Sequence, residues 1–138
     1  MDRIMPDNEH FRRSETFHKR KSEYDKAFFQ HGTILQTVYI DWYLTAVFRS
    51  ARHLVRAYIY ATWKDCPENL VFLKMKGNAK LNQRHLIKSY KVLETFKDAL
   101  QNDAINFTKK DCDDANEAYD VIESAITPFF FEHVRPLQ

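Results

Sequence analysis

Residues 34–63 decide the fold, and they read ILQTVYIDWYLTAVFRSARHLVRAYIYATW. This stretch contains neither glycine nor proline, and its fixed charges are confined to Asp41, Arg49, Arg52 and Arg56. Apolar residues surround the helix axis instead of forming one narrow stripe, which is typical of a helix packed among others. The charge-free run from Trp42 to Phe48 is far shorter than the roughly 20 residues that a bilayer requires. The stretch therefore predicts a long central helix of a bundle, Ile34–Trp63, and no membrane span.

The composition favours one all-α domain covering residues 1–138, with disorder expected in 1–6. Two glycines and four prolines are few for a chain rich in turns, and 44% apolar residues are enough for a full core. We expect a four-helix up-and-down antiparallel bundle with a long central helix. Cys66 and Cys112 fit no disulfide framework, and no signal peptide opens the sequence, so a cytoplasmic location is expected.

Three long helices are expected around the central one. The first begins at Asp7 or Asn8, continues through Phe28 and ends at the glycine of His31-Gly32-Thr33. A short helical segment follows at Leu70–Lys76, and the next long helix covers Leu81–Asn102. The apolar face of the first helix is expected at Phe11, Phe17, Tyr24 and Phe28.

The last helix is predicted from a cap and an end. Thr108 with Asp111 three residues later resembles a capping box. Pro128 is expected to end or kink this helix, because proline lacks the backbone N–H that a helix interior needs. The three phenylalanines that follow, residues 129–131, then require cover from the bundle or a partner.

Charge is unevenly distributed along the chain although the net charge is only +2. Residues 49–97 contain eleven Lys/Arg and three Asp/Glu, whereas residues 98–138 contain three Lys/Arg and nine Asp/Glu. A surface with two signs of charge suits an anionic partner or a second copy of the chain. Together with the phenylalanine run, this pattern predicts a homodimer.

Two groups of polar residues contain several cations each and could bind phosphate. The first shares one face of the central helix, at steps of three and four residues, and comprises Asp41, Thr45, Arg49, Arg52 and Arg56. Guanidinium groups bind phosphates bidentately, but the same face could simply meet solvent or pair with the acidic last helix. The second group lies in and around the Leu81–Asn102 helix, with Phe72 and Tyr90 nearby, and comprises Lys74, Lys76, Lys80, Arg84, Lys88 and Lys91. The steps from Lys80 through Arg84 and Lys88 to Lys91 make one basic face. Such a face is all that phosphate-backbone binding needs, although a solvated helix surface has the same pattern.

His53 is the candidate for chemistry among six histidines. It lies on the same side of the central helix as the small residues Ala46, Ser50 and Ala57, so a buried, hydrogen-bonded role competes with a catalytic one. The spacing of His, Cys and acidic residues fits no metal-ligand pattern, and two glycines cannot build a phosphate loop. Neither a metal nor a cofactor is predicted.

The pattern from Asp41 onward resembles the HEPN domains, small helical bundles of defence and toxin–antitoxin systems. A subgroup of that family has the run D-W-x-x-x-A-h-F/Y-x-x-A-x-H-h-x-x-A-Y on its central helix. The matching residues here are Asp41-Trp42, Ala46, Phe48, Ala51, His53 and Ala57-Tyr58. A second set matches the later half of the subgroup: Tyr90, Leu93, Phe107-Thr108, Asp111 and Ala115.

The resemblance implies a helical bundle, a dimer and a role linked to RNA. HEPN nucleases use an arginine and a histidine separated by four to six residues, and Arg49 is separated from His53 by three. The spacing is met by Arg3–His10, Arg12–His18 and Arg13–His18. We therefore expect a non-catalytic binding module that contacts RNA or a protein or nucleotide partner. The alternatives are a metal-independent ribonuclease and a protein-only interaction factor or inhibitor encoded by a mobile element.

Overall fold

The computed structural model describes residues 4–30, 36, 39–102 and 106–132, and no strand occurs among them. The elements are α1 (Ile4–Gln30), α2 (Ile40–Ala61), a short 3-10 helix (Glu68–Leu70), α3 (Val71–Lys76), α4 (Arg84–Gln101) and α5 (Lys109–Glu132). The prediction of an all-α protein is confirmed. Within the described ranges, no helix contains a segment long and apolar enough to cross a membrane.

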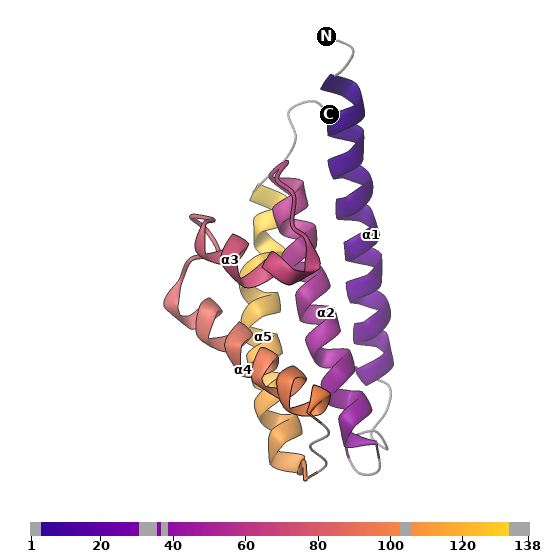
Figure 1. Cartoon of the computed structure of the whole chain (residues 1–138), viewed down its shortest axis with the longest axis vertical. Coiled ribbons are helices and arrows are strands. Elements are labelled where there is room, and N and C mark those ends of the chain that lie inside the picture. The colour runs from indigo at the N-terminus through magenta and orange to yellow at the C-terminus, as the bar shows by residue number, and fades with distance from the viewer. Residues whose placement is uncertain (1–3, 31–35, 37–38, 103–105, 133–138) are drawn as a thin grey trace.

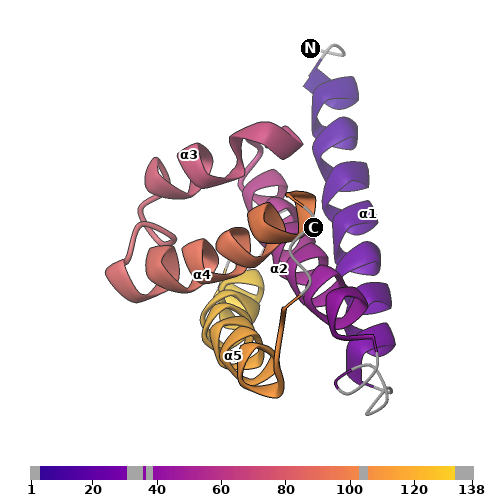
Figure 2. The same ribbon diagram turned by 60° about the horizontal axis from the view of Figure 1, so that its bottom comes forward.

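The central position of α2 is evident from both views of the fold (Figures 1 and 2). α1 runs antiparallel along one side of α2, and α4 and α5 pack against the other side. α4 crosses α2 and α5 obliquely instead of running alongside them. The four long helices expected from the sequence are present, but a regular up-and-down bundle describes their arrangement only in part.

α2 begins later than predicted, at Ile40 instead of Ile34. Of residues 34–39 the structure describes Gln36 and Tyr39, and Tyr39 is the N-cap residue of α2. Asp41 then lies in the first turn, where the helix dipole favours a carboxylate. The stop predicted at residues 31–33 lies outside the described residues.

α2 ends at Ala61 in a Schellman motif whose left-handed position is filled by tryptophan. The amide of Lys64 donates to the carbonyl of Ile59, and the amide of Trp63 donates to the carbonyl of Tyr60. Glycine usually occupies the position of Trp63 because this motif requires a positive φ, here 64°. The predicted end at Trp63 is therefore two residues late: Trp63 belongs to the cap that closes the helix.

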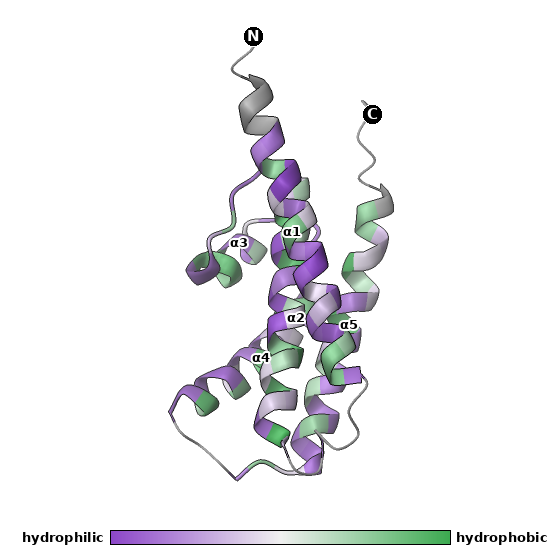
Figure 3. Ribbon diagram, turned by 90° about the vertical axis from the view of Figure 1, so that its right-hand side faces the viewer, coloured by the Kyte–Doolittle hydropathy of each residue, from purple (hydrophilic) through white to green (hydrophobic). Residues whose placement is uncertain are grey.

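The buried face of α1 is mostly polar, so the prediction of an aromatic one was wrong for three of its four residues; the fourth, Phe11, is half-buried against the core. Phe17, Tyr24 and Phe28 are 55%, 67% and 44% exposed. The buried side chains are spaced by three and four residues: Glu15, His18, Ser22, Asp25 and Phe29. This face meets polar groups of α2, and hydrophilic residues run along most of α1 (Figure 3).

α1 also begins at Ile4, before the cap expected at Asp7 or Asn8. Residues 4–6 of the segment expected to be disordered therefore belong to this helix, and residues 1–3 lie outside the described ranges. The first turns of α1 project beyond the end of α2 (Figure 1).

The boundaries of the last two long helices also differ from expectation. α4 begins at Arg84 instead of Leu81, because the Asn78 side chain holds the preceding residues in a turn. α5 begins after Thr108, whose amide donates to the Asp111 carboxylate at 2.8 Å, as in one half of a capping box. α5 then continues through Pro128 to Glu132, so the proline does not end the helix.

Candidate functional site

A basic groove lies along the outer side of α4, next to α3. It has a volume of about 590 Å³. Its lining includes the apolar residues Ile87 and Val92 and four cations: Lys76, Arg84, Lys88 and Lys91. All four cations are exposed. The groove therefore contains four of the six cations of the basic cluster expected from the sequence, and Lys74 and Lys80 are the two that do not line it.

A turn and a helical step place these cations together. The Asn78 side-chain oxygen accepts the amides of Lys80 at 2.9 Å and Leu81 at 3.0 Å, and the buried Leu81 side chain anchors the turn in the core. α4 then begins at Arg84, and steps of four and three residues bring Lys88 and Lys91 onto the same side of the helix.

The electrostatics of the groove favour an anion. In the described part of the chain, no carboxylate contributes to the groove lining, and Arg84 and Lys88 form no ion pair. The first turn of α4, all of it described, contains no acidic residue that would offset the positive end of the helix dipole. The ammonium groups of Lys76 and Lys91 lie 5.2 and 5.4 Å from the ring of Phe72.

Lys80 does not line the groove. Its ammonium group lies over the ring of Phe129, 5.1 Å from the centroid, at the end of α5. The chain direction changes at the turn before α4, so the helical spacing from Lys80 to Arg84 that the sequence suggested does not extend across it.

The three arginines of α2 each contact a neighbouring segment. Arg49 lies 3.8 Å from Asp25 of α1, and Arg52 pairs with Glu68 at 2.8 Å. Arg56 donates from Nε to the carbonyl of Cys66 at 2.8 Å. The predicted stripe therefore divides into an exposed part that ends at Arg49 and a half-buried part that ties α2 to the segment before α3.

His53 is buried against a histidine of α1. The Nδ1 atoms of His18 and His53 are 2.7 Å apart, and the two rings are stacked with centroids 4.9 Å apart. Burial, together with Arg52 and Arg56 nearby, lowers the pKa of His18 to about 4 and that of His53 to about 3. Both rings are therefore neutral at neutral pH, and one Nδ1–H donates to the other Nδ1.

A second hollow, of about 440 Å³, opens beside this histidine pair. Residues of the N-terminal half of α1 line it, including His10, Arg13, Phe17 and His18. His10 also contacts Asp65 at 3.2 Å. Arg13 and His18 are one of the pairs whose spacing fits the HEPN nuclease motif, whereas their contact with His53 was not predicted. The signal for that contact was the polar series at steps of three and four along α1.

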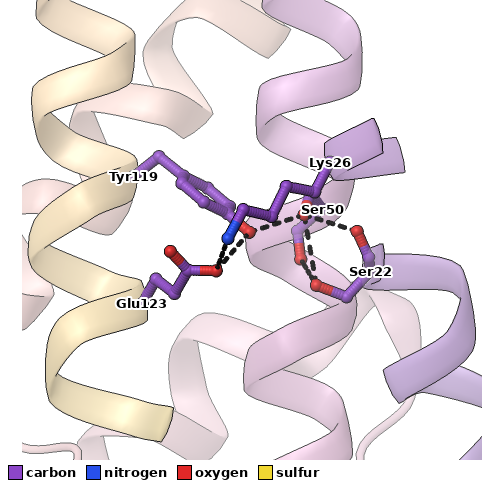
Figure 4. A network of polar contacts seen from close by, with 5 residues as sticks. All are labelled: Ser22, Lys26, Ser50, Tyr119 and Glu123. Carbon is purple, nitrogen blue, oxygen red and sulfur yellow. Dashed lines mark hydrogen bonds and ion pairs between the residues drawn. The ribbon is translucent and has the colours of Figure 1, made fainter. Parts of the chain in front are cut away.

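A polar network joins α1, α2 and α5 at their closest approach (Figure 4). The hydroxyls of Ser22 and Ser50 each donate to the carbonyl of the other residue at 2.8 Å. Because both serine protons go to carbonyls, the Tyr119 hydroxyl donates to Ser50 at 2.9 Å and lies 3.4 Å from Glu123, which accepts from Lys26. Ser22, Ser50 and Tyr119 are buried, Lys26 and Glu123 are partly exposed, and the network ties the three helices together.

Both cysteines are buried. Burial raises the pKa of the Cys66 thiol to about 11, and Cys112 is likewise buried and unbonded. In the described residues, no group of three or more His, Cys, Asp or Glu could hold a metal ion. Comparison of the chain with protein-family models, with curated proteins and with solved structures finds no match.

Proposed function

We propose that this chain is a non-catalytic RNA-binding module that holds the phosphate backbone in the basic groove of α3 and α4. The observation that carries the proposal is the convergence of four exposed cations on one groove without a carboxylate in its described lining. Neutralising phosphates releases condensed counterions, and this effect needs no base-reading groups.

The basic groove suits RNA better than it suits an acidic protein surface. Ile87 and Val92 give the groove an apolar base, and cation–π contacts with Phe72 hold the ammonium groups of Lys76 and Lys91. Ribose and base edges can rest on such a surface while the cations meet phosphates. Membership of the HEPN family and a role in a defence or toxin–antitoxin system remain proposals based on the sequence pattern. Two buried, unbonded thiols are compatible with a cytoplasmic setting.

Fluorescence anisotropy with a labelled single-stranded RNA tests the groove. The variant Arg84→Ala/Lys88→Ala/Lys91→Ala is expected to bind on the order of a hundredfold more weakly at 0.1 M salt, since each lost phosphate contact contributes about 0.7 decades there. The matched control is Arg12→Ala/Arg20→Ala/Lys64→Ala, which removes three exposed cations elsewhere. An equal loss in both variants would show attraction by net charge alone and contradict the proposal. Binding of a protein partner in place of RNA would favour the interaction-factor alternative.

A ribonuclease is the second candidate, and the histidine pair favours it. His18 lines an open hollow together with Arg13 and contacts His53, so a proton acceptor and a cation lie near one another. Against it, both pKa values are too low for either ring to serve as an acid at neutral pH. The test is RNA cleavage in EDTA by the wild type, His18→Ala and His53→Ala, with melting temperatures measured in parallel. Cleavage that either substitution abolishes without lowering the melting temperature would establish the enzyme.

A homodimer is proposed as the working assembly, through a different surface from the one first expected. Phe129 and Phe130 are half-buried against Tyr58, and the side chain of Phe131 lies outside the described residues. Exposed apolar surface is found instead on α3, where Leu73 is 64% exposed. Light scattering at micromolar concentration tests the assembly, and a species of 16.5 kDa alone would refute it.

A further inference from the structure

A third hollow, distinct from the basic groove and from the hollow beside the histidine pair, has a volume of about 570 Å³ and lies between α1 and the first turns of α2. Three aromatic side chains line it: Tyr24 and Phe28 from α1, and Trp42 from α2. Each is at least 44% exposed. Among the described residues these three rings do not contact one another, although Trp42 stacks on Tyr39 with centroids 5.1 Å apart. We name this hollow the aromatic cleft; apolar ring surface faces it from both helices.

The polar groups of the aromatic cleft include a hydrogen-bond acceptor and a donor. The carboxylate of Asp41 is exposed and pairs with no described residue. The Arg49 side chain is 44% exposed and belongs to the cleft lining, and its Nε lies 3.8 Å from Asp25, beyond hydrogen-bond distance. Leu100 of α4 adds an apolar wall.

These groups together select a neutral, flat and polar ligand. An organic cation would be attracted by the rings and by Asp41, but the guanidinium of Arg49 stands in the same lining. A phosphate would meet the carboxylates of Asp25 and Asp41. An aromatic heterocycle that carries both N–H donors and acceptors satisfies every group in the cleft.

We propose that the aromatic cleft binds an unpaired nucleobase, with guanine preferred. The base stacks on the rings of α1 and α2, as unpaired bases do on aromatic side chains. Guanine presents two adjacent N–H groups that one carboxylate, Asp41, accepts together, and its O6 and N7 accept from an arginine such as Arg49. The inference rests on the proposed function in one respect: the base is taken to belong to the RNA whose phosphates lie in the basic groove.

Tryptophan fluorescence measures this binding directly. The chain has two tryptophans, so in a Trp63→Phe background Trp42 is the sole reporter and lies in the cleft. Guanosine is expected to quench its emission in a saturable manner, and uridine is expected to quench it less. Asp41→Asn and Tyr24→Ala are each expected to weaken guanosine binding about tenfold, the loss typical of one hydrogen bond to a charged group or one stacked base.

Phe17→Ala is the matched control, because Phe17 is as exposed as the cleft aromatics and lies on α1 outside the cleft lining. It should leave guanosine binding unchanged. Four results would overturn the proposal: no quenching by guanosine, equal quenching by uridine, saturable quenching by tetramethylammonium, or Trp42 emission that depends on protein concentration without any ligand. The last result would assign the cleft to a second copy of the chain.

The same titration separates this proposal from the RNA-binding groove. A nucleoside carries no phosphate, so guanosine should still quench Trp42 when Arg84, Lys88 and Lys91 are replaced by alanine. If the chain binds guanosine but not RNA, the guanine-binding proposal stands and the RNA-binding proposal is contradicted. If it binds RNA but not guanosine, the guanine-binding proposal is contradicted and the RNA-binding proposal stands.

Discussion

At the scale of single residues, the histidine pair of α1 and α2 makes stability depend on pH. The pKa values of His18 and His53 are lowered to about 4 and about 3. The unfolded chain therefore binds two protons near pH 6.5 that the folded chain does not bind. Nearby cations of both helices lower these pKa values further: Lys21, Arg52 and Arg56. The contribution of the neutral pair to the free energy of unfolding should therefore be complete above pH 6.5. Below that pH the free energy of unfolding should decrease, by up to about 2.7 kcal/mol per pH unit.

Urea denaturation at pH 7, 6 and 5 measures this dependence in a window where ordinary carboxylates titrate little. His53→Gln keeps a polar partner for His18 and removes one of the two titrating groups. The slope between pH 6.5 and 5 should therefore be about half as steep in this variant. Equal slopes in the wild type and the variant would show that the pair does not control the effect.

Trp63 is the residue with the clearest backbone cost. Its φ of 64° is left-handed, and this conformation costs a residue with a Cβ atom about 1–2 kcal/mol. Trp63→Gly should raise the free energy of unfolding by about 1 kcal/mol, after allowance for the greater freedom of glycine in the unfolded chain. Trp63→Phe keeps the strain and should stay close to the wild type in the same urea experiment. A clear loss of stability in Trp63→Gly would mean that the indole is held by packing that outweighs the strain.

At the scale of elements, α5 tolerates a proline in its interior. Pro128 has no N–H to offer the carbonyl four residues before it, and its side chain is exposed. Pro128→Ala should therefore restore one backbone hydrogen bond and raise the free energy of unfolding, by about 1 to 3 kcal/mol. The neighbouring Thr127→Ala, also exposed, should change it by less than about 0.5 kcal/mol. Thermal unfolding compares the two, and a lower melting temperature for Pro128→Ala would contradict this account.

The element that sequence reasoning described least well is α1. Its aromatic residues recur at helical spacing, and the rule that apolar stripes face the core assigned them to the interior. A second series, Glu15, His18, Ser22 and Asp25, has the same period and is the one that is buried. The two series could not be ranked without α2, because polar side chains are buried only where a partner satisfies them. Ser50 and His53 are such partners, and only tertiary packing brings them opposite α1.

At the scale of the whole molecule, what local sequence determines was predictable and what packing determines was not. Low glycine content and the long apolar stretch were sufficient to predict an all-α protein centred on α2. The cations of α4 were also recognisable, because one helix places them by its own period. Lys76 was part of the basic cluster read from the sequence, but its place beside α4 depends on packing. The contacts of the α2 arginines were not predicted, because Asp25, Glu68 and the Cys66 carbonyl reach them from distant segments.

The dependence of RNA affinity on salt tests the central claim most directly. If the four cations of the basic groove each neutralise a phosphate, log K for a single-stranded RNA should fall with log [NaCl] with a slope of about −3, and Arg84→Ala/Lys88→Ala/Lys91→Ala should reduce that slope by about 2. The control Arg12→Ala/Arg20→Ala/Lys64→Ala should keep the wild-type slope. A groove variant with the wild-type slope, or a wild-type affinity that does not change with salt, would contradict the account.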